Sequence, residues 1–171
     1  MPAPVPPAPL DDLRAAAIAQ ARLAAAHDDV PVGAVVARGG EVIAVGRNRR
    51  ELDQDPTAHA EVLALRGAAA AIGNWHLDGC DLVVTLEPCT MCAGAIALSR
   101  IDRVVYGAAD PKAGVARSVL RLVDEGPHNH RPEVVAGVRA EECGRLLTDF
   151  FAARRAGRRP GRRRPDAADG M

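Results

Sequence analysis

The sequence predicts an α/β fold with three layers, in which helices cover both faces of one five-stranded mixed sheet. Short runs rich in valine alternate along the chain with longer helical stretches. A glycine pair, Gly39-Gly40, marks a hairpin between the first two strand-like runs. A hairpin followed by alternating helices and strands requires both antiparallel and parallel neighbours, and parallel strands are covered on both faces.

The first part of the chain supplies a helix and the hairpin. Apolar residues at helical spacing in an alanine background predict a helix over residues 10–27. Strand-like runs follow at 30–37 and 41–46. Pro31 and Gly33 are unfavourable inside a strand, so we expect a bulge there or the close approach of a ligand's backbone.

The rest of the chain alternates helices with strands. A helix over residues 61–72 follows Asp55-Pro56-Thr57, and Thr57 is expected to be its N-cap. Apolar runs of strand length and stretches of helical spacing mark the elements that follow. The further expected strands are 81–86, 103–106 and 133–138, and the further expected helices are 93–98, 119–125 and 141–156.

Length and composition predict one domain at residues 10–156, flanked by a disordered proline-rich leader (1–9) and a disordered arginine-rich tail (157–171). Only four residues are aromatic, so the core must be aliphatic. Four cysteines do not suggest a disulfide scaffold, which favours a reducing compartment. The sequence shows neither a signal peptide nor an apolar run of the roughly 18–20 residues that a membrane span needs. We therefore expect a cytoplasmic protein that does not associate with a membrane.

The net charge is zero, but basic and acidic residues are distributed unevenly along the chain. The last 20 residues hold seven arginines and two aspartates, which leaves the first 151 residues with a net charge of −5. An acidic body with a basic tail suggests that an anionic partner meets the tail. A solvated arginine-rich end without a partner is the alternative.

The segment from residue 57 to residue 92 carries the chemistry. Cys89 and Cys92 are three residues apart at the start of a helix opened by Pro88, so both sulfurs lie on one side of its first turn. A helix N-terminus favours the thiolate, which is the form that binds metal. His59 lies near the start of another helix. Two helix starts that face each other would supply one nitrogen and two sulfurs.

Zinc prefers four ligands in a tetrahedron, and three protein ligands leave the fourth position for water, as in catalytic sites. Glu61 is two residues from His59 and therefore not on the same helix face. We expect its carboxylate beside the metal but outside the ligand shell, where it can move protons. The whole pattern, H-x-E followed by P-C-x-x-C, is the signature of zinc-dependent deaminases.

Each part of the pattern also has a simpler interpretation. A lone CxxC can be a thioredoxin-like redox pair. Free cysteines are often just buried, and a histidine near a helix start is often structural. None of these explains the joint pattern, which therefore favours the metal site. Cys80 and Cys143 have no ligand-like neighbours in the sequence and are expected to be core or surface thiols.

With these motifs in view, the chain resembles the bacterial tRNA-specific adenosine deaminases (the TadA family), which have the cytidine deaminase-like fold. The resemblance covers residues 10–156. The zinc motif alone identifies only the superfamily, whereas Asp110-Pro111-Lys112 and Asp149-Phe150-Phe151 narrow it to the tRNA enzymes. The other matching segments are 30–35, 55–61, 85–95, 99–101, 103–108 and 129–130.

The resemblance implies a homodimer with one zinc ion per subunit that converts adenosine to inosine at the wobble position of a tRNA anticodon, typically in an arginine tRNA. It implies that Glu61 is the proton shuttle and that Asn48 positions the flipped base. The zinc ligands that it implies are His59, Cys89 and Cys92. The remaining contacts to the anticodon stem-loop that it implies are Asp110, Lys112, Phe150 and Phe151.

Three positions depart from the family's pattern. Ala109 and Ala152 stand where a basic residue is common, which removes two possible phosphate contacts. Arg117 stands where glycine is common. We hypothesise that Arg117 and the arginine-rich tail compensate for the two missing basic residues.

Two other functions compete with this interpretation. A small-molecule deaminase of the same fold would act on guanine, cytosine or a nucleoside, but it has no need of the Asp110 loop, the long last helix or the basic tail. A non-catalytic RNA-binding partner or scaffold would keep zinc only for structure, but it has no need of Glu61 beside an open metal position.

Overall fold

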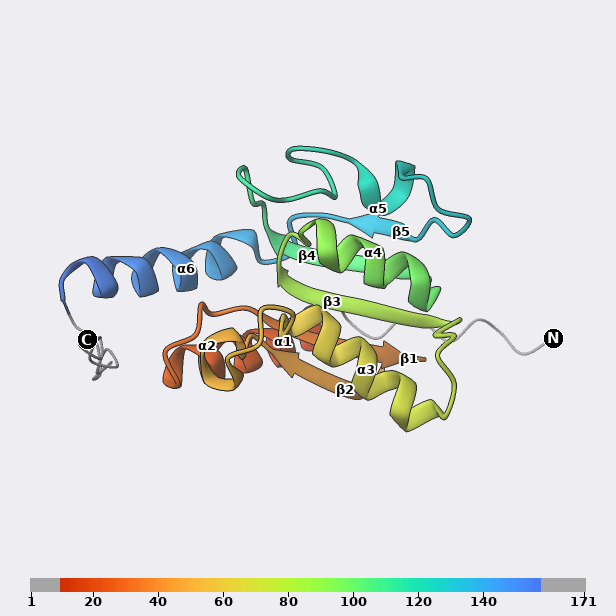
Figure 1. Ribbon diagram of the computed structural model, residues 1–171, viewed down its shortest axis with the longest axis horizontal. Helices are drawn as coiled ribbons and strands as arrows, with labels where there is room; N and C mark the ends of the chain where they lie inside the picture. Colours follow the sequence, from red (N-terminus) through yellow and green to blue (C-terminus); the bar gives the residue numbers. More distant parts are fainter. Residues whose placement is uncertain (1–9, 158–171) are drawn as a thin grey trace, which may run out of the picture.

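The computed structural model describes residues 10–157, and these form the three-layer α/β arrangement predicted from the sequence (Figure 1). The predicted leader and nearly all of the predicted tail lie outside the described residues. The strands are β1 (Gly33–Arg38), β2 (Glu41–Arg47), β3 (Cys80–Leu86), β4 (Arg103–Ala108) and β5 (Glu133–Val135). The helices are α1 (Leu10–Ala26), α2 (Arg50–Asp53), α3 (Ala60–Ile72), α4 (Thr90–Ser99), α5 (Leu122–Glu125) and α6 (Ala140–Arg155).

The five strands form one mixed sheet in the order β2-β1-β3-β4-β5. Strand β1 is antiparallel to both β2 and β3, whereas β3, β4 and β5 run parallel. Ligand sites of such sheets lie beyond the carboxyl ends of the parallel strands. The edge at which β3 ends at Leu86 and β4 ends at Ala108 is therefore the place to look for a site.

Helices α3 and α4 cover one face of the sheet, and α1 and α6 lie on the other. Side chains of β1, β3 and β4 share one apolar cluster with α3 and α4, while Leu13 and Ala17 of α1 pack on the alternate residues of the same strands. The core is aliphatic, as predicted, and Tyr106 is the aromatic residue buried in it. Helix α6 runs on beyond the end of the sheet (Figure 1).

The close approach expected at Gly33 is made by a helix and not by a ligand. A β-carbon at Gly33 would lie 2.0 Å from the carbonyl oxygen of Ala17 and 2.4 Å from the nitrogen of Ala21, so α1 packs directly on the backbone of β1. The bulge lies elsewhere, where the β1–β2 register shifts between Val36 and Ala37. Only glycine permits this helix-to-strand distance.

The helix predicted over 61–72 is present, but its predicted N-cap, Thr57, is wrong. The Thr57 hydroxyl and backbone N–H both donate hydrogen bonds of 2.8 Å to Asp55 Oδ1, which makes a local turn that competes with helix formation. Helix α3 instead begins at Ala60, with His59 as an extended N-cap residue.

Helix α2 was not predicted. Its first turn depends on a distant acceptor: the buried carboxylate of Asp29 accepts hydrogen bonds from the backbone N–H of Glu51 (2.7 Å) and Leu52 (3.1 Å). Such an acceptor, 22 residues away in the chain, leaves no local signature. Within residues 10–157, no helix combines the length and the apolar content that crossing a bilayer demands.

Candidate active site

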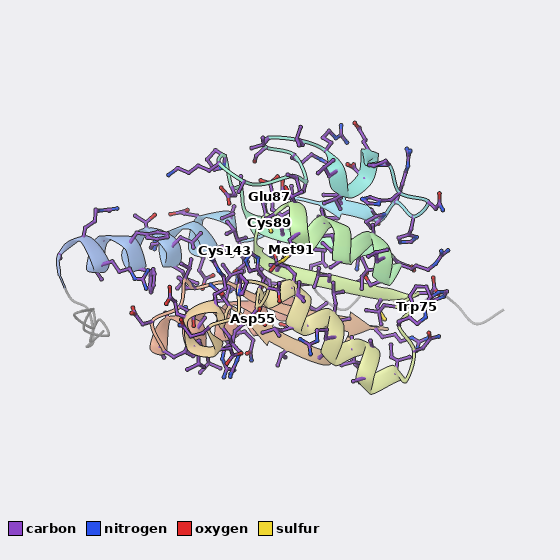
Figure 2. All side chains as sticks on the ribbon, in the orientation of Figure 1. Asp55, Trp75, Glu87, Cys89, Met91 and Cys143 are labelled. Atoms are coloured by element: carbon purple, nitrogen blue, oxygen red, sulfur yellow. The ribbon has the colours of Figure 1, made fainter. Side chains whose placement is uncertain are left out.

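The two helix starts face each other as predicted. His59 is the N-cap residue of α3, Cys89 is the N-cap residue of α4, and Cys92 lies in the first turn of α4. His59 Nδ1 lies 3.6 Å from Cys89 Sγ and 3.5 Å from Cys92 Sγ. The three ligand atoms lie within 4.8 Å of one another. Figure 2 shows Cys89 where β3 leads into α4.

These distances match the edges of a zinc tetrahedron. With Zn–S of about 2.3 Å and Zn–N of about 2.05 Å, the tetrahedral angle sets the nitrogen-to-sulfur distance at about 3.6 Å. The two observed distances, 3.6 and 3.5 Å, agree with this value. One imidazole and two thiols also form the borderline-soft donor set that suits zinc. The residues present therefore fit a zinc ion.

Neither N-cap side chain is used to cap its helix, so both are available to bind a metal ion. Neither His59 nor Cys89 makes a side-chain cap hydrogen bond, and both have extended backbone conformations. Helix N-termini carry partial positive charge, which favours thiolate in the space between α3 and α4.

A hydrogen bond between the two sulfurs shifts their pKa values in opposite directions. Hydrogen bonds from Cys92 and from His59 lower the pKa of the Cys89 thiol to about 3. The pKa of the Cys92 thiol is raised, because that thiol donates the hydrogen bond to Cys89 and is buried. Metal ligation requires both sulfurs as thiolates, so binding of a divalent cation displaces the Cys92 proton.

Glu61 is a buried carboxylate that lines the cavity next to His59. It is 3% exposed, and its Oε2 atom has no hydrogen-bond partner among the described residues. Burial raises the pKa of this carboxyl to about 7, where it can both accept and donate a proton near neutral pH. Because His59 is an extended N-cap residue and not a helical one, it and Glu61 line the same cavity although they are two residues apart.

Asn48 also lines this cavity, which has a volume of about 190 Å³. Asn48 is 7% exposed, and both ends of its amide are held by the backbone. Its Nδ2 donates to Val30 O (3.1 Å), and its Oδ1 accepts from the backbone N–H of Arg50 (3.2 Å). The amide is thus fixed in orientation at the wall of the cavity.

A second and larger cavity, of about 730 Å³, lies between the 109–112 loop and α6. Asp110 lines both cavities, whereas Lys112 and Phe151 line only the larger one. Phe150 lines neither of the two: its ring lies 4.7 Å from the guanidinium carbon of Arg154 and packs edge-on against Phe151. The structure therefore brings most of the predicted substrate contacts to two adjoining cavities.

Sequence reasoning did not single out two arginines that line these cavities, Arg50 in the smaller one and Arg155 in the larger, although Arg155 was counted in the basic end of the chain. Their positions depend on α2 and on the last turn of α6, and no local motif marks either residue. Arg117, which was expected to supply a substitute phosphate contact, is already engaged: its guanidinium donates to Asp124 Oδ2 (2.8 Å) and to the carbonyl of Ala116.

Comparison with known proteins identifies the family of this chain. The sequence model of the MafB19-like deaminases matches residues 11–155. The tRNA-specific adenosine deaminase of Bacillus subtilis is 50% identical over 135 residues, which are 79% of this chain and 84% of that protein. The chain belongs to the tRNA-specific adenosine deaminase family.

Two solved structures are similar to this deaminase. One, from a study of A-to-I editing by tRNA:A34 deaminases at the wobble position, has a TM-score of 0.77 and 44% identity, and the match covers 80% of this chain and 99% of that one. The other, a guanine deaminase from Nitrosomonas europaea, has a TM-score of 0.71 and 26% identity over 85% and 86% of the two chains. The first match confirms the predicted fold, and family membership makes the chain a hydrolytic deaminase.

Proposed function

We propose that this deaminase converts adenosine to inosine at the wobble position of a tRNA anticodon, and that its substrate is an arginine tRNA, as the sequence resemblance implies. One observation carries the proposal: the unpartnered carboxylate oxygen of Glu61 lies beside three metal donors, in a cavity that adjoins the larger one. The larger cavity, with its basic and aromatic lining, favours RNA over a free base. A tRNA substrate implies a cytoplasmic enzyme.

We propose that His59, Cys89 and Cys92 hold one zinc ion per chain, as the match to the tetrahedral edge supports. Zinc, when bound, supplies Lewis acidity that lowers the pKa of water from about 15.7 toward 7.

Glu61 moves the protons of the reaction. Its carboxylate accepts one proton from the attacking water and donates it to the ring nitrogen next to C6 of adenine. It then takes the second water proton and delivers it to the amino group on C6. The C6–N bond breaks, the oxygen of the water stays on C6, and ammonia leaves. A carboxyl with a pKa of about 7 suits both directions of transfer.

The other residues recognise the nucleotide. The target base must leave its stack to reach the cavity, and an anticodon loop offers bases that are already single-stranded. Asn48 has one amide hydrogen left after its bond to Val30, which it offers to the base. Phe151, 41% exposed at the larger cavity, offers a ring on which a neighbouring base can stack.

Ammonia release tests the proposed function. The deaminase is incubated in parallel with an anticodon stem-loop that carries adenosine at the wobble position, with free bases and with nucleosides. We expect ammonia only from the stem-loop, and none when inosine replaces the wobble adenosine. Comparable kcat/KM on guanine, cytosine or a free nucleoside would show the small-molecule deaminase instead.

The homodimer is also a proposal, and an exposed apolar face supports it. Between α3 and α4 lies an almost wholly apolar groove of about 240 Å³ that includes Val62, Ala95 and Leu98. Leu98 is 72% exposed and Trp75 is 64% exposed at the same face (Figure 2 shows Trp75 near the end of α3). A continuous apolar face of this kind marks an association surface.

We expect Leu98→Glu to turn the dimer into a monomer, because it puts a charge into an apolar interface. Light scattering after size-exclusion chromatography measures the mass. The control is Leu23→Glu on α1, on the opposite face of the sheet, where the wild-type leucine is 48% exposed. A wild-type monomer, or a Leu98→Glu variant that stays dimeric, would contradict the proposal.

The arginine-rich tail is expected to bind the phosphate backbone. Deleting residues 157–171 removes five arginines, and the slope of log affinity against log salt should become shallower by about 0.7–0.9 for each phosphate that the tail neutralises. Binding titrations with tRNA at several salt concentrations measure the slope. An unchanged affinity and slope would show that the tail is only a solvated end.

A further inference from the structure

The buried carboxylate of Glu87, which directly follows β3, accepts five hydrogen bonds. It is 2% exposed. Its Oε2 accepts hydrogen bonds from the backbone N–H of Asp110 (2.9 Å) and from the hydroxyl of Ser118. Its Oε1 accepts from the backbone N–H of Ala116 (3.1 Å), Arg117 (2.7 Å) and Ser118 (2.9 Å). One side chain thus binds both ends of the loop that follows β4.

The loop is built around this carboxylate. Residues 109–118 contain no helix or strand, and although Asp110 accepts hydrogen bonds from the backbone N–H groups of residues 112–114, others need acceptors from outside the loop. A carboxylate provides about four acceptor positions, more than any other side chain. The fit is close at Gly114, where a β-carbon would lie 2.4 Å from Glu87 Oε2. The backbone N–H of Val115 adds a hydrogen bond of 2.9 Å to the carbonyl of Pro88.

The same loop forms walls of both cavities. Asp110 and Ala113 line the cavity that His59 and Cys89 also line, and Asp110 and Lys112 line the larger one. Glu87 is also two residues before Cys89 and lies next to it in Figure 2. It therefore links the segment that carries Cys89 to the loop that carries Asp110 and Lys112.

We propose that Glu87 is a positioning residue that holds the 109–118 loop in place for the RNA. This inference rests on the proposed function, since it concerns how the same site binds a polynucleotide. Glu87 lines the smaller cavity, but all the described hydrogen bonds of its side chain go to the loop, so its effect on the reaction passes through Asp110 and Lys112. The loop in turn sets the affinity for RNA.

The variant Glu87→Gln tests the proposal. It keeps the shape of the side chain but replaces one acceptor oxygen with an NH₂ donor, which then faces two or three donors of the loop. We expect backbone amide exchange at residues 116–118 to accelerate by about tenfold or more. On the stem-loop, we expect KM to rise by about tenfold or more while kcat changes by less than about threefold. Zinc content should stay at one per chain.

Two further variants separate positioning from general stability. Ser118→Ala removes one of the donors and should produce a smaller change in the same two quantities. Glu41→Gln, on exposed β2, should change neither. A purely structural role would instead lower kcat, zinc content and the melting temperature together and leave KM unchanged.

Hydrogen exchange keeps the two proposals distinguishable. If the wild-type enzyme fails to act on RNA, the proposed function is wrong, yet the exchange rates still report whether Glu87 holds the loop. If Glu87→Gln does not fold, the same measurements on Ser118→Ala decide. Wild-type exchange at residues 116–118, or an unchanged KM for the stem-loop, in the variant that is measured would overturn the inference.

Discussion

Replacing Glu61 by glutamine is expected to lower kcat on the anticodon stem-loop by about 10³-fold or more. The amide has the shape of the carboxyl but cannot accept a proton from water or pass it to the ring nitrogen, and general acid–base catalysis accounts for factors of about 10²–10⁴. The Glu61 carboxylate has one oxygen without a hydrogen-bond partner among the described residues, and its side chain lines the cavity. Single-turnover kinetics with saturating enzyme measures the loss in the chemical step.

The same variant should fold at least as well as the wild-type protein. Glu61 is 3% exposed and lacks a partner at Oε2, and an unpaired buried charge destabilises the folded state. The melting temperature and zinc content should therefore be unchanged or higher. Glu133→Gln, an exposed carboxylate on β5, is the matched control and should keep full activity. Wild-type turnover in Glu61→Gln would remove Glu61 from the proton pathway.

Replacing Cys92 by alanine is expected to abolish both metal binding and turnover. Its sulfur lies 3.5 Å from His59 Nδ1 and is one of three donors, so its loss leaves one nitrogen and one sulfur, too few to hold zinc at a catalytic site. Zinc content should fall from one per chain to near zero, and ammonia release should fall to the background. Because metal binding contributes to folding, the melting temperature should also fall.

The matched control for this loss is Cys80→Ala. Cys80 is fully buried at the start of β3 and is not one of the three donors. Removing its sulfur creates a small cavity, with a cost on the order of 1 kcal/mol, and should leave zinc and activity unchanged. Zinc bound at wild-type affinity by Cys92→Ala would show that the metal is held elsewhere.

The meeting of His59, Cys89 and Cys92 could be predicted because local sequence determines it. Cys89 and Cys92 share the first turn of one helix, and His59 begins another, so the spacing alone indicates which side chains meet. The sheet was predictable for the same reason: valine-rich runs and a glycine turn are local signals. Where neighbours in the chain decide the conformation, most elements were predicted correctly, but the local turn between Asp55 and Thr57 was missed, and His59 is the N-cap residue instead of Thr57.

The rest depends on contacts between distant residues. Helix α2 forms because Asp29 caps it from 22 positions away, and Gly33 is required because α1 packs on its backbone. Arg117 was expected to face RNA, yet it binds Asp124, and only the folded loop makes that pair possible. The role of Glu87 was hidden as well, because its partners lie 23 to 31 residues further along the chain.

X-ray absorption at the zinc edge, on protein purified without added metal, tests the central claim most directly. We predict one zinc per chain with two sulfur ligands at about 2.3 Å and two nitrogen or oxygen ligands at about 2.0–2.1 Å. That result describes an ion held by His59, Cys89 and Cys92 with one position open for the reaction. A folded, metal-free protein, or zinc surrounded by four sulfurs, would contradict it.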